Sequence, residues 1–185
     1  MKQVIRENCF ETNSSSEHTI TICNINEYKY KEIPKGQNLI IFPYDHDKKG
    51  YSYTYTSRGN YEKAQLLLST LGYEIEKQLY DVVPYDENRD YDDIRKERRQ
   101  NFYNVPIVVA YVNALKRYIG EEYTVDILFT SDNVPFIDYV SFEETTESIL
   151  GIEKKDLTDI EKLTDLFYKI IFDNEMQIVD SYHDS

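Results

Sequence analysis

The sequence predicts a mixed α+β fold in one domain, residues 1–185, with a largely antiparallel sheet packed against about three helices. Short alternating or apolar runs, which are typical of strands, occur near both ends and in the middle of the chain. Three longer segments repeat apolar residues at three- and four-residue steps, as amphipathic helices do. The order of strands, helices, strands, helix and strand favours an antiparallel sheet over alternating parallel units.

The strands are predicted from patterns of apolar and polar residues. Thr and Ile alternate over 19–23, an apolar run covers 39–42, and Tyr alternates with Ser and Thr over 51–56. A further strand is expected at 123–130, followed by a turn at 131–133. Its hairpin partner is expected at 134–140, where Pro135 favours the edge of a sheet. A last strand is expected at 176–180, with a flexible tail at about 181–185.

Three segments predict helices. The first is expected to begin at Asn60 as its N-cap, to include Gly72 and to end before Pro84. The second lies between 103 and 120, because Pro106 suits a first helical turn and Gly120 suits a helix end. The third is expected over 158–172, where Thr158 and Glu161 match a capping box.

An acidic linker is expected at about 81–93, where six carboxylates stand against Arg89 alone. A basic cluster follows directly: Arg95, Lys96, Arg98 and Arg99. The order predicts a linker followed by the start of a charged helix. The basic side chains are expected on a solvated face or in pairs with the acidic block.

Composition narrows the class of protein. The net charge of −13 disfavours direct binding to nucleic acid or to an acidic membrane, and instead suits a basic partner surface. The first residues lack a signal peptide, and no apolar run approaches the length of a membrane span, so the protein is expected in the cytoplasm with reduced thiols.

Two Cys and three His lack the spacing of a zinc site, so neither a metal nor a cofactor is expected. Eighteen tyrosines suit protein interfaces.

The stretch FETNSSSEH, residues 10–18, is the main candidate for a ligand site. Its small polar residues can present hydroxyls and backbone N–H groups to a phosphate, with a nearby arginine as a second donor. The side chains of this site would be Arg6, Glu11, Asn13, Ser14, Ser15, Ser16 and His18. Because flanking glycines are absent, the stretch is neither a P-loop nor a nucleophile elbow. An architectural polar turn before a strand explains the same residues.

This stretch also resembles the opening of a family of small proteins from Gram-positive bacteria and their phages. The matching residues are Arg6, Phe10, Glu11, Thr12, Asn13, Ser14, Ser15, Ser16 and His18. Weaker similarities are Ile137, Asp138 and Ser141, with Tyr139 where the family tends to have His, and the late segment FDNEMQIVD. The resemblance implies a mobile-element context and a shared site around the motif. Tyr139 argues against a metal or catalytic role for that second position here.

The leading hypothesis is an inhibitor from a phage or mobile element, without enzymatic activity of its own. It would bind a host nuclease of a defence system, as anti-CRISPR or anti-restriction proteins do. There it would either act as a DNA mimic in the basic nucleic-acid groove of the nuclease or lock its conformation. The expected partner-binding residues are Asp86, Glu87, Asp90, Tyr91, Asp92, Asp93, Glu143 and Glu144. The alternative is an enzyme or nucleotide-binding protein with its site at FETNSSSEH.

Overall fold

The computed structural model describes residues 16–24, 31–44, 52–57, 59–128 and 146–184, and helices dominate this part of the chain. The α-helices are α1 (Asn60–Thr70), α2 (Gly72–Val82), α3 (Tyr91–Asn101), α4 (Pro106–Ile119), α5 (Thr146–Leu150) and α6 (Ile160–Phe172). Two short 3-10 helices are η2 (Phe102–Asn104) and η3 (Lys154–Thr158). The strands are β1 (Ser16–Asn24), β2 (Leu39–Ile41), β3 (Ser52–Ser57), β4 (Val125–Ile127) and β5 (Met176–Asp184).

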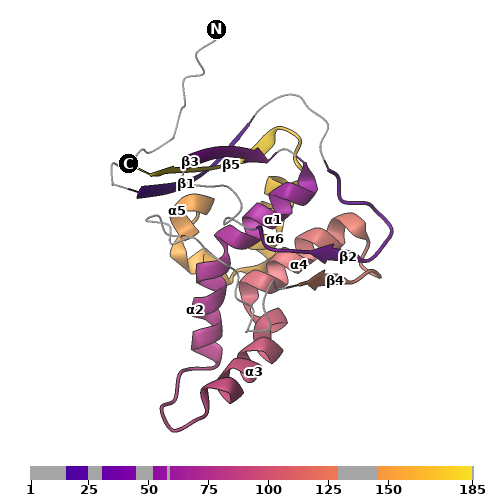
Figure 1. Cartoon of the computed structure of the whole chain (residues 1–185). Helices are drawn as coiled ribbons and strands as arrows, with labels where there is room; N and C mark the ends of the chain where they lie inside the picture. The colour runs from indigo at the N-terminus through magenta and orange to yellow at the C-terminus, as the bar shows by residue number, and fades with distance from the viewer. Residues whose placement is uncertain (1–15, 25–30, 45–51, 58, 129–145, 185) are drawn as a thin grey trace.

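The described strands form two separate small sheets (Figure 1). In one sheet β5 lies between β1 and β3 and is antiparallel to both. In the other, β2 and β4 run parallel, with Leu39 opposite Val125 and Ile41 opposite Ile127. A parallel pair needs a long crossover connection, and here the chain passes through β3 and the helices α1 to α4 between the two strands.

The predicted fold class is wrong. Instead of a largely antiparallel sheet on about three helices, the described residues form a predominantly helical body with six α-helices and two small sheets. The sequence pattern at 123–130 was expected to pair with its neighbour in a hairpin, but β4 pairs in parallel with the distant β2. The expected hairpin partner at 134–140 lies outside the described residues. Local alternation identifies a strand without identifying its partner, and the partner here is set by tertiary packing.

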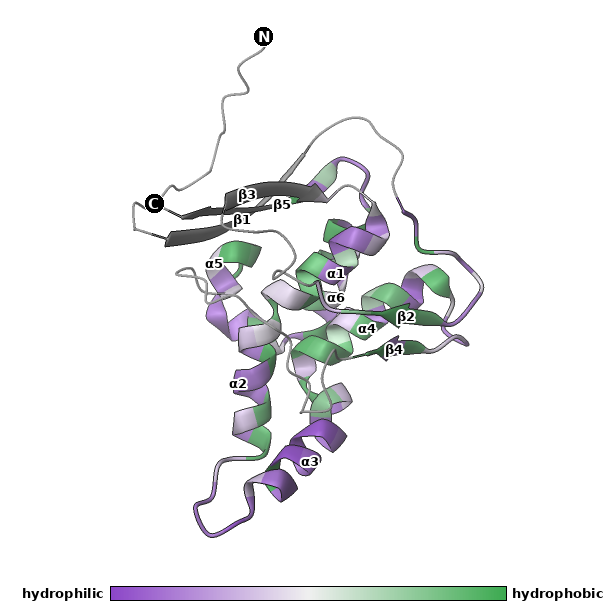
Figure 2. Ribbon diagram, viewed as in Figure 1, coloured by the Kyte–Doolittle hydropathy of each residue, from purple (hydrophilic) through white to green (hydrophobic). Residues whose placement is uncertain are grey.

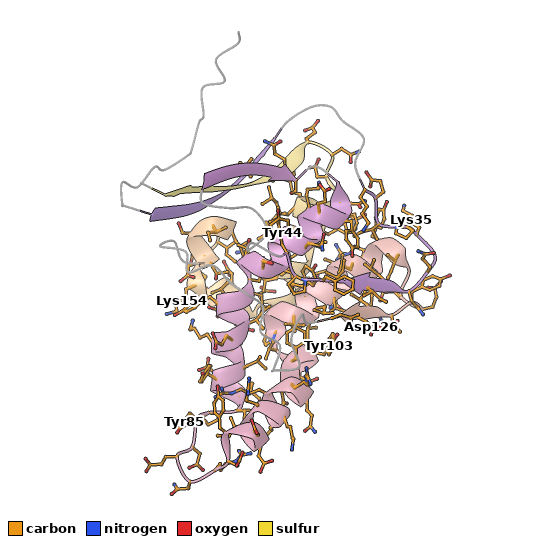
Figure 3. All side chains as sticks on the ribbon, in the orientation of Figure 1. Lys35, Tyr44, Tyr85, Tyr103, Asp126 and Lys154 are labelled. Atoms are coloured by element: carbon orange, nitrogen blue, oxygen red, sulfur yellow. The ribbon has the colours of Figure 1, made fainter. Side chains whose placement is uncertain are left out.

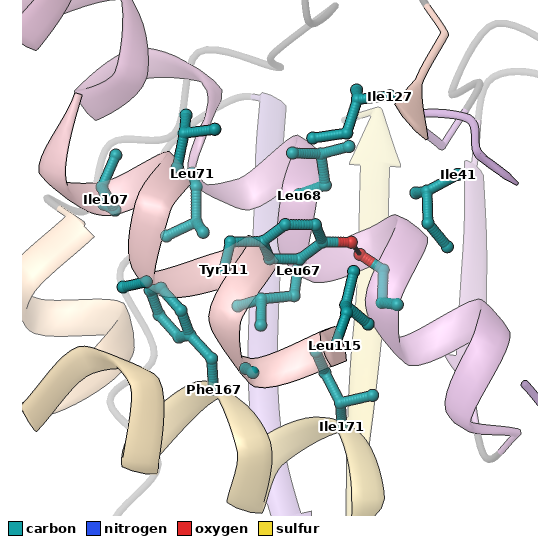
Figure 4. Close-up of a cluster of buried hydrophobic side chains, with 14 of the residues drawn as sticks. Ile41, Leu67, Leu68, Leu71, Ile107, Tyr111, Leu115, Ile127, Phe167 and Ile171 are labelled. Atoms are coloured by element: carbon teal, nitrogen blue, oxygen red, sulfur yellow. Dashed lines mark hydrogen bonds between the residues drawn. The ribbon is translucent and has the colours of Figure 1, made fainter. Parts of the chain in front are cut away.

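The core lies where α1, α4 and α6 meet beneath the antiparallel sheet (Figures 1 and 2). Helix α1 is buried around most of its circumference, whereas α4 and α6 bury one face each. Tyr111 of α4 is fully buried at the centre of this packing, and its hydroxyl donates a hydrogen bond of 2.7 Å to the carbonyl of Ala64 (Figure 4). Burial raises the pKa of the Tyr111 phenol well above its ordinary value. The side chain therefore serves as an apolar filler and as a donor between two helices.

The helix boundaries follow the sequence signals in part. Helix α4 begins at Pro106 and ends at Gly120, whose φ of 117° is unfavourable for other residues, so this prediction is confirmed. The first predicted helix is two helices, because the chain breaks at Leu71 just before Gly72. Thr70 donates its hydroxyl to the carbonyl of Leu66, a bond that favours bending at this place.

Two predicted caps are wrong. Gly59 is the N-cap of α1, and the buried Asn60 side chain instead accepts a hydrogen bond from the backbone N–H of Ile33. Asp159, rather than Thr158, is the N-cap of α6, and its carboxylate accepts from the backbone N–H of Lys162 at 3.1 Å. The N-cap is thus the residue before Asn60 in α1 and the residue after Thr158 in α6, and only Asp159 supplies a side-chain cap. The Asn60 side chain, which was predicted to cap the helix, instead contacts a residue that is distant in the sequence.

Lys63 is a buried lysine that links α1 to the end of α6. It is 1% exposed, and its ammonium donates to the carbonyls of Asp173 at 2.9 Å and Met176 at 3.2 Å. These carbonyls lie at the C-cap of α6 and at the start of β5. Burial lowers the Lys63 pKa from 10.5 to about 8, while the charges of Asp173 and Glu32 oppose this change. The lysine thus holds the turn between α6 and the central strand of the antiparallel sheet.

Tyr111→Phe is expected to lower the free energy of unfolding by about 1 kcal/mol, because it removes one buried hydrogen bond without removing the ring. The corresponding decrease in melting temperature is about 2–4 °C for a chain of this size. Thermal denaturation checks this, with Tyr85→Phe as the control, since Tyr85 is 63% exposed. Equal melting temperatures for the two variants would contradict the role given to the Tyr111 hydroxyl.

The buried Lys63 predicts a pH dependence of stability. Its pKa is lower in the folded protein than in the unfolded chain, so between about pH 8 and about pH 10.5 the unfolded chain binds more protons. The contribution of Lys63 to the free energy of unfolding therefore rises with pH between about pH 8 and about pH 10.5. Relative to Lys63→Met, the wild type is expected to gain about 1–2 kcal/mol from about pH 7 to about pH 9.5. Urea denaturation at each pH measures the difference, and parallel curves for the two proteins would refute it.

Candidate partner-binding arm

Helices α2 and α3 form a hairpin that projects from the body, and we call residues 72–101 the arm (Figure 1). The two helices pack along each other, and the loop that joins them, residues 83–90, forms the tip. Tyr85 lies at this tip, as Figure 3 shows. The acidic linker predicted at about 81–93 therefore spans the end of α2, the loop and the first turn of α3.

Gln78 fixes the base of the arm to the body. This buried side chain accepts from the backbone N–H of Ile107, in the first turn of α4, at 3.2 Å. Its amide nitrogen donates to the carbonyl of Leu157 in η3 at 3.2 Å. The N–H of Ile107 lies in a helical turn whose donors lack partners within the helix. One side chain thus joins the arm to two elements of the body and satisfies a helix end.

Arg98 holds the two helices of the arm together. Its guanidinium carbon lies 3.6 Å from the centroid of the Tyr80 ring, and its Nε donates to the carbonyl of Val83 at 3.0 Å. That carbonyl belongs to the C-cap of α2. The side chain is 5% exposed, so the prediction of a solvated or ion-paired side chain is wrong for Arg98. It follows Ile94, the other buried residue of α3, by one helical turn.

The loop at the tip is ordered by two of its own carboxylates. Asp86 accepts from the backbone N–H of Asn88 at 2.9 Å and from its side-chain amide at 3.1 Å, and these bonds lower the Asp86 pKa. Asp90 is the N-cap of α3 and accepts from the backbone N–H of Asp92 at 2.8 Å. Both carboxylates thus shape the loop by accepting hydrogen bonds from residues two positions further along the chain.

Two of the four basic residues, Arg95 and Lys96, pair with the acidic block as expected, and a third ion pair joins Arg89 to Glu97. Arg89 contacts Glu97 at 2.7 Å, and the contact raises the Arg89 pKa. The pairs Arg95–Asp92 and Lys96–Asp93 are longer, at 3.7 Å each. All three pairs are solvent-accessible, so each contributes little to stability. Carboxylates in the first turn of α3 and cations in its last turn also match the helix dipole.

The arm exposes large side chains as well as charges. The exposed fraction is 54% for Tyr73, 41% for Tyr80, 53% for Val82, 63% for Tyr85 and 54% for Tyr91. Two of these rings are held by arginines, since Arg98 stacks on Tyr80 and the Arg95 guanidinium lies 5.2 Å from the Tyr91 centroid. Aromatic rings are enriched at the centres of protein-binding surfaces, whereas carboxylates are depleted there and belong to the polar rim. Figure 2 shows α3 as one of the most hydrophilic elements of the protein.

The structure brings six of the predicted partner-binding residues together on the arm: Asp86, Glu87, Asp90, Tyr91, Asp92 and Asp93. Glu143 and Glu144 lie outside the described residues. Sequence reasoning missed Tyr80 and Tyr85 as members of this surface. Their position beside the acidic linker was the available signal, but exposure of a tyrosine cannot be read from its sequence position alone.

The predicted phosphate site lies mostly outside the described residues, which exclude Arg6, Glu11, Asn13, Ser14 and Ser15. Ser16 and His18 belong to β1, where their backbones pair with Asp184 and Tyr182 of β5. Asp45, His46 and Asp47, which the sequence places in a loop, also lie outside the described residues. Within the described ranges, no group of three or more His, Cys, Asp and Glu side chains is arranged to hold a metal ion.

Arg98→Ala is expected to lower the free energy of unfolding by about 1–3 kcal/mol, because the Val83 carbonyl loses its charged donor and Tyr80 loses its stacked cation. Arg99→Ala is the matched control, since this neighbouring arginine is exposed. Hydrogen exchange at residues 83–90 is expected to speed up in the Arg98 variant only. Similar exchange and stability in the two variants would show that Arg98 does not hold the arm together.

Comparisons with known proteins leave the chain without an assigned relative: no family model, curated protein or solved structure matches it. The resemblance of residues 6–18 to proteins of Gram-positive bacteria and their phages stays a prediction. None of the helices in the described part combines the length and the apolar character needed to cross a membrane.

Proposed function

We propose that the protein is an inhibitor from a phage or mobile element that binds a nucleic-acid-acting nuclease of a host defence system. In this proposal the arm contacts a basic surface of the nuclease, of the kind that normally holds nucleic acid. The protein would act in the cytoplasm of the host. The observation that carries the proposal is the presence of exposed tyrosines and ionised carboxylates on one projecting, internally bonded element.

The charge of residues 81–93, at and beside the tip of the arm, supports a basic partner. Between residues 81 and 93 there are six carboxylates and one arginine, in a chain whose net charge is −13. The carboxylate of Glu87 is exposed at the tip, and those of Asp86 and Asp90 are fixed by the loop. A negative patch of this kind attracts a positive groove and speeds association. The same charge repels nucleic acid, which is consistent with binding to the nuclease instead of to its substrate.

The rigidity of the arm supports a role in binding. Gln78 fixes its base, Arg98 joins its helices, and Asp86 and Asp90 order its loop. A surface that is ordered before binding loses less conformational entropy on association. Tyr80 and Tyr91, whose rings lie against arginines, and Tyr85 at the tip are the expected aromatic contacts with the partner.

The test uses a panel of purified RNA-guided nucleases and restriction endonucleases, each assayed for complex formation, DNA binding and DNA cleavage. Inhibition of at least one nuclease is expected, with an affinity that falls as the salt concentration rises. Tyr85→Ser combined with Glu87→Gln is expected to weaken that inhibition about tenfold or more, because it removes an aromatic contact and a charge.

The matched control is Ile160→Ser combined with Glu161→Gln, which changes one exposed apolar and one exposed acidic residue at the start of α6. This control is expected to inhibit as the wild type does. Normal cleavage and no complex across the whole panel would refute the proposed function. Equal loss of inhibition in both variants would refute the role of the arm.

A further inference from the structure

The parallel pair of β2 and β4 has a solvent-facing side that is separate from the tip of the arm (Figures 1 and 3). Leu39, Ile41, Val125 and Ile127 point into the core from this pair, and each is at most 6% exposed. The alternation of the strands directs the intervening residues outward. Ile40 and Asp126, which lie directly opposite each other in the register, are both exposed.

Large exposed apolar side chains lie on the same side of the pair as Asp126. The exposed fraction is 47% for Ile40, 44% for Phe42 and 43% for Leu128. Tyr103, 44% exposed, borders β4, because its hydroxyl accepts from the backbone N–H of Ile127 at 2.9 Å. We call Ile40, Phe42, Tyr103, Asp126 and Leu128 the sheet face. Contiguous apolar exposure of this kind marks an interaction surface more often than scattered single residues do.

The edges of the pair are occupied by side chains, which limits how a partner can bind. On the β2 side, the Tyr61 hydroxyl donates to the carbonyl of Ile40 at 3.2 Å, and the Gln65 amide donates to that of Phe42 at 3.0 Å. On the β4 side, Tyr103 occupies the N–H of Ile127. A partner strand would have to displace these bonds to extend the sheet. The sheet face therefore favours contact through side chains over strand addition.

Asp126 determines the charge of the partner. Among the residues that the structure describes, the ion pairs do not include Asp126, and its partner in the register is the exposed Ile40. A second copy of this chain is a poor occupant, because both copies carry a net charge of −13 and would bring like charges together. A cationic group flanked by apolar groups complements both the Asp126 carboxylate and the apolar side chains of the sheet face.

We propose that the sheet face is a docking site for a basic segment of a partner protein, in which one arginine or lysine is flanked by apolar side chains. The cation pairs with Asp126, and the flanking side chains cover Ile40, Phe42 and Leu128. This contact is independent of the arm and does not require that the partner be a nuclease. It adds a second binding surface whose specificity depends on one carboxylate within an apolar patch.

The experiment titrates the full chain with a short peptide in which leucine and arginine alternate, and follows backbone amide shifts by NMR. Shifts are expected at residues 39–42 and 125–128 and not at the arm loop, residues 83–90. Asp126→Asn is expected to weaken binding roughly two- to fivefold, as for an exposed ion pair. Phe42→Ser is expected to weaken it roughly tenfold.

Controls test the sign of the charge that the site accepts and the place where the peptide binds. A peptide in which leucine and glutamate alternate is expected not to bind, and Ile160→Ser, an exposed apolar residue of α6, is expected to leave binding unchanged. If Phe42→Ser fails to fold by circular dichroism, Ile40→Ser replaces it. Binding of the glutamate peptide, shifts centred on the arm loop, or equal effects of Phe42→Ser and Ile160→Ser would overturn the proposal. The proposal would also be overturned if sedimentation showed dimers of the full chain and monomers of Phe42→Ser.

Discussion

Buried helix ends need hydrogen-bond partners, and in this protein side chains from distant elements supply them. Lys63 donates to the carbonyl at the C-cap of α6, Gln78 accepts from the first turn of α4, and Arg98 donates to the carbonyl at the C-cap of α2. Each of these residues is at most 6% exposed. A polar group left without a partner at such depth costs more than an ordinary hydrogen bond contributes. The arrangement of the helices therefore depends on these three contacts as well as on apolar packing.

This constraint explains which features the sequence could reveal. Pro106 and Gly120 act through their own backbone geometry, so the bounds of α4 were predictable. Asn60 and Arg98 act through partners 27 and 15 residues away, and neither contact follows from local pattern. The parallel pairing of β2 with β4 is of the same kind, since the two strands meet only after the intervening helices have packed. Acidic residues of the arm were identifiable by composition, whereas the exposure of Tyr80 and Tyr85 depended on the fold.

The arm and the sheet face divide two kinds of surface between them. The arm combines charges that are mostly satisfied within it, by turns, caps and ion pairs, with aromatic rings that remain exposed. The sheet face is mainly apolar and carries one carboxylate. Surfaces of these compositions suit different partners or different parts of one partner. Electrostatic attraction mainly affects the rate of association, whereas apolar burial mainly slows dissociation.

The bonds within the arm join residues close in sequence, and this has a consequence for the order of folding. Arg98 reaches Val83 across 15 residues, and Arg89 reaches Glu97 across 8, whereas Asn38 meets Thr124 beside the parallel pair across 86. Closing a short loop costs less chain entropy than closing a long one, and local contacts form faster. The α2–α3 hairpin is thus able to form early, while the chain that follows it is still unfolded. By the same argument the parallel pair, where Asn38 and Thr124 meet across 86 residues, is expected to form after the arm, so that the sheet face is completed later than the α2–α3 hairpin.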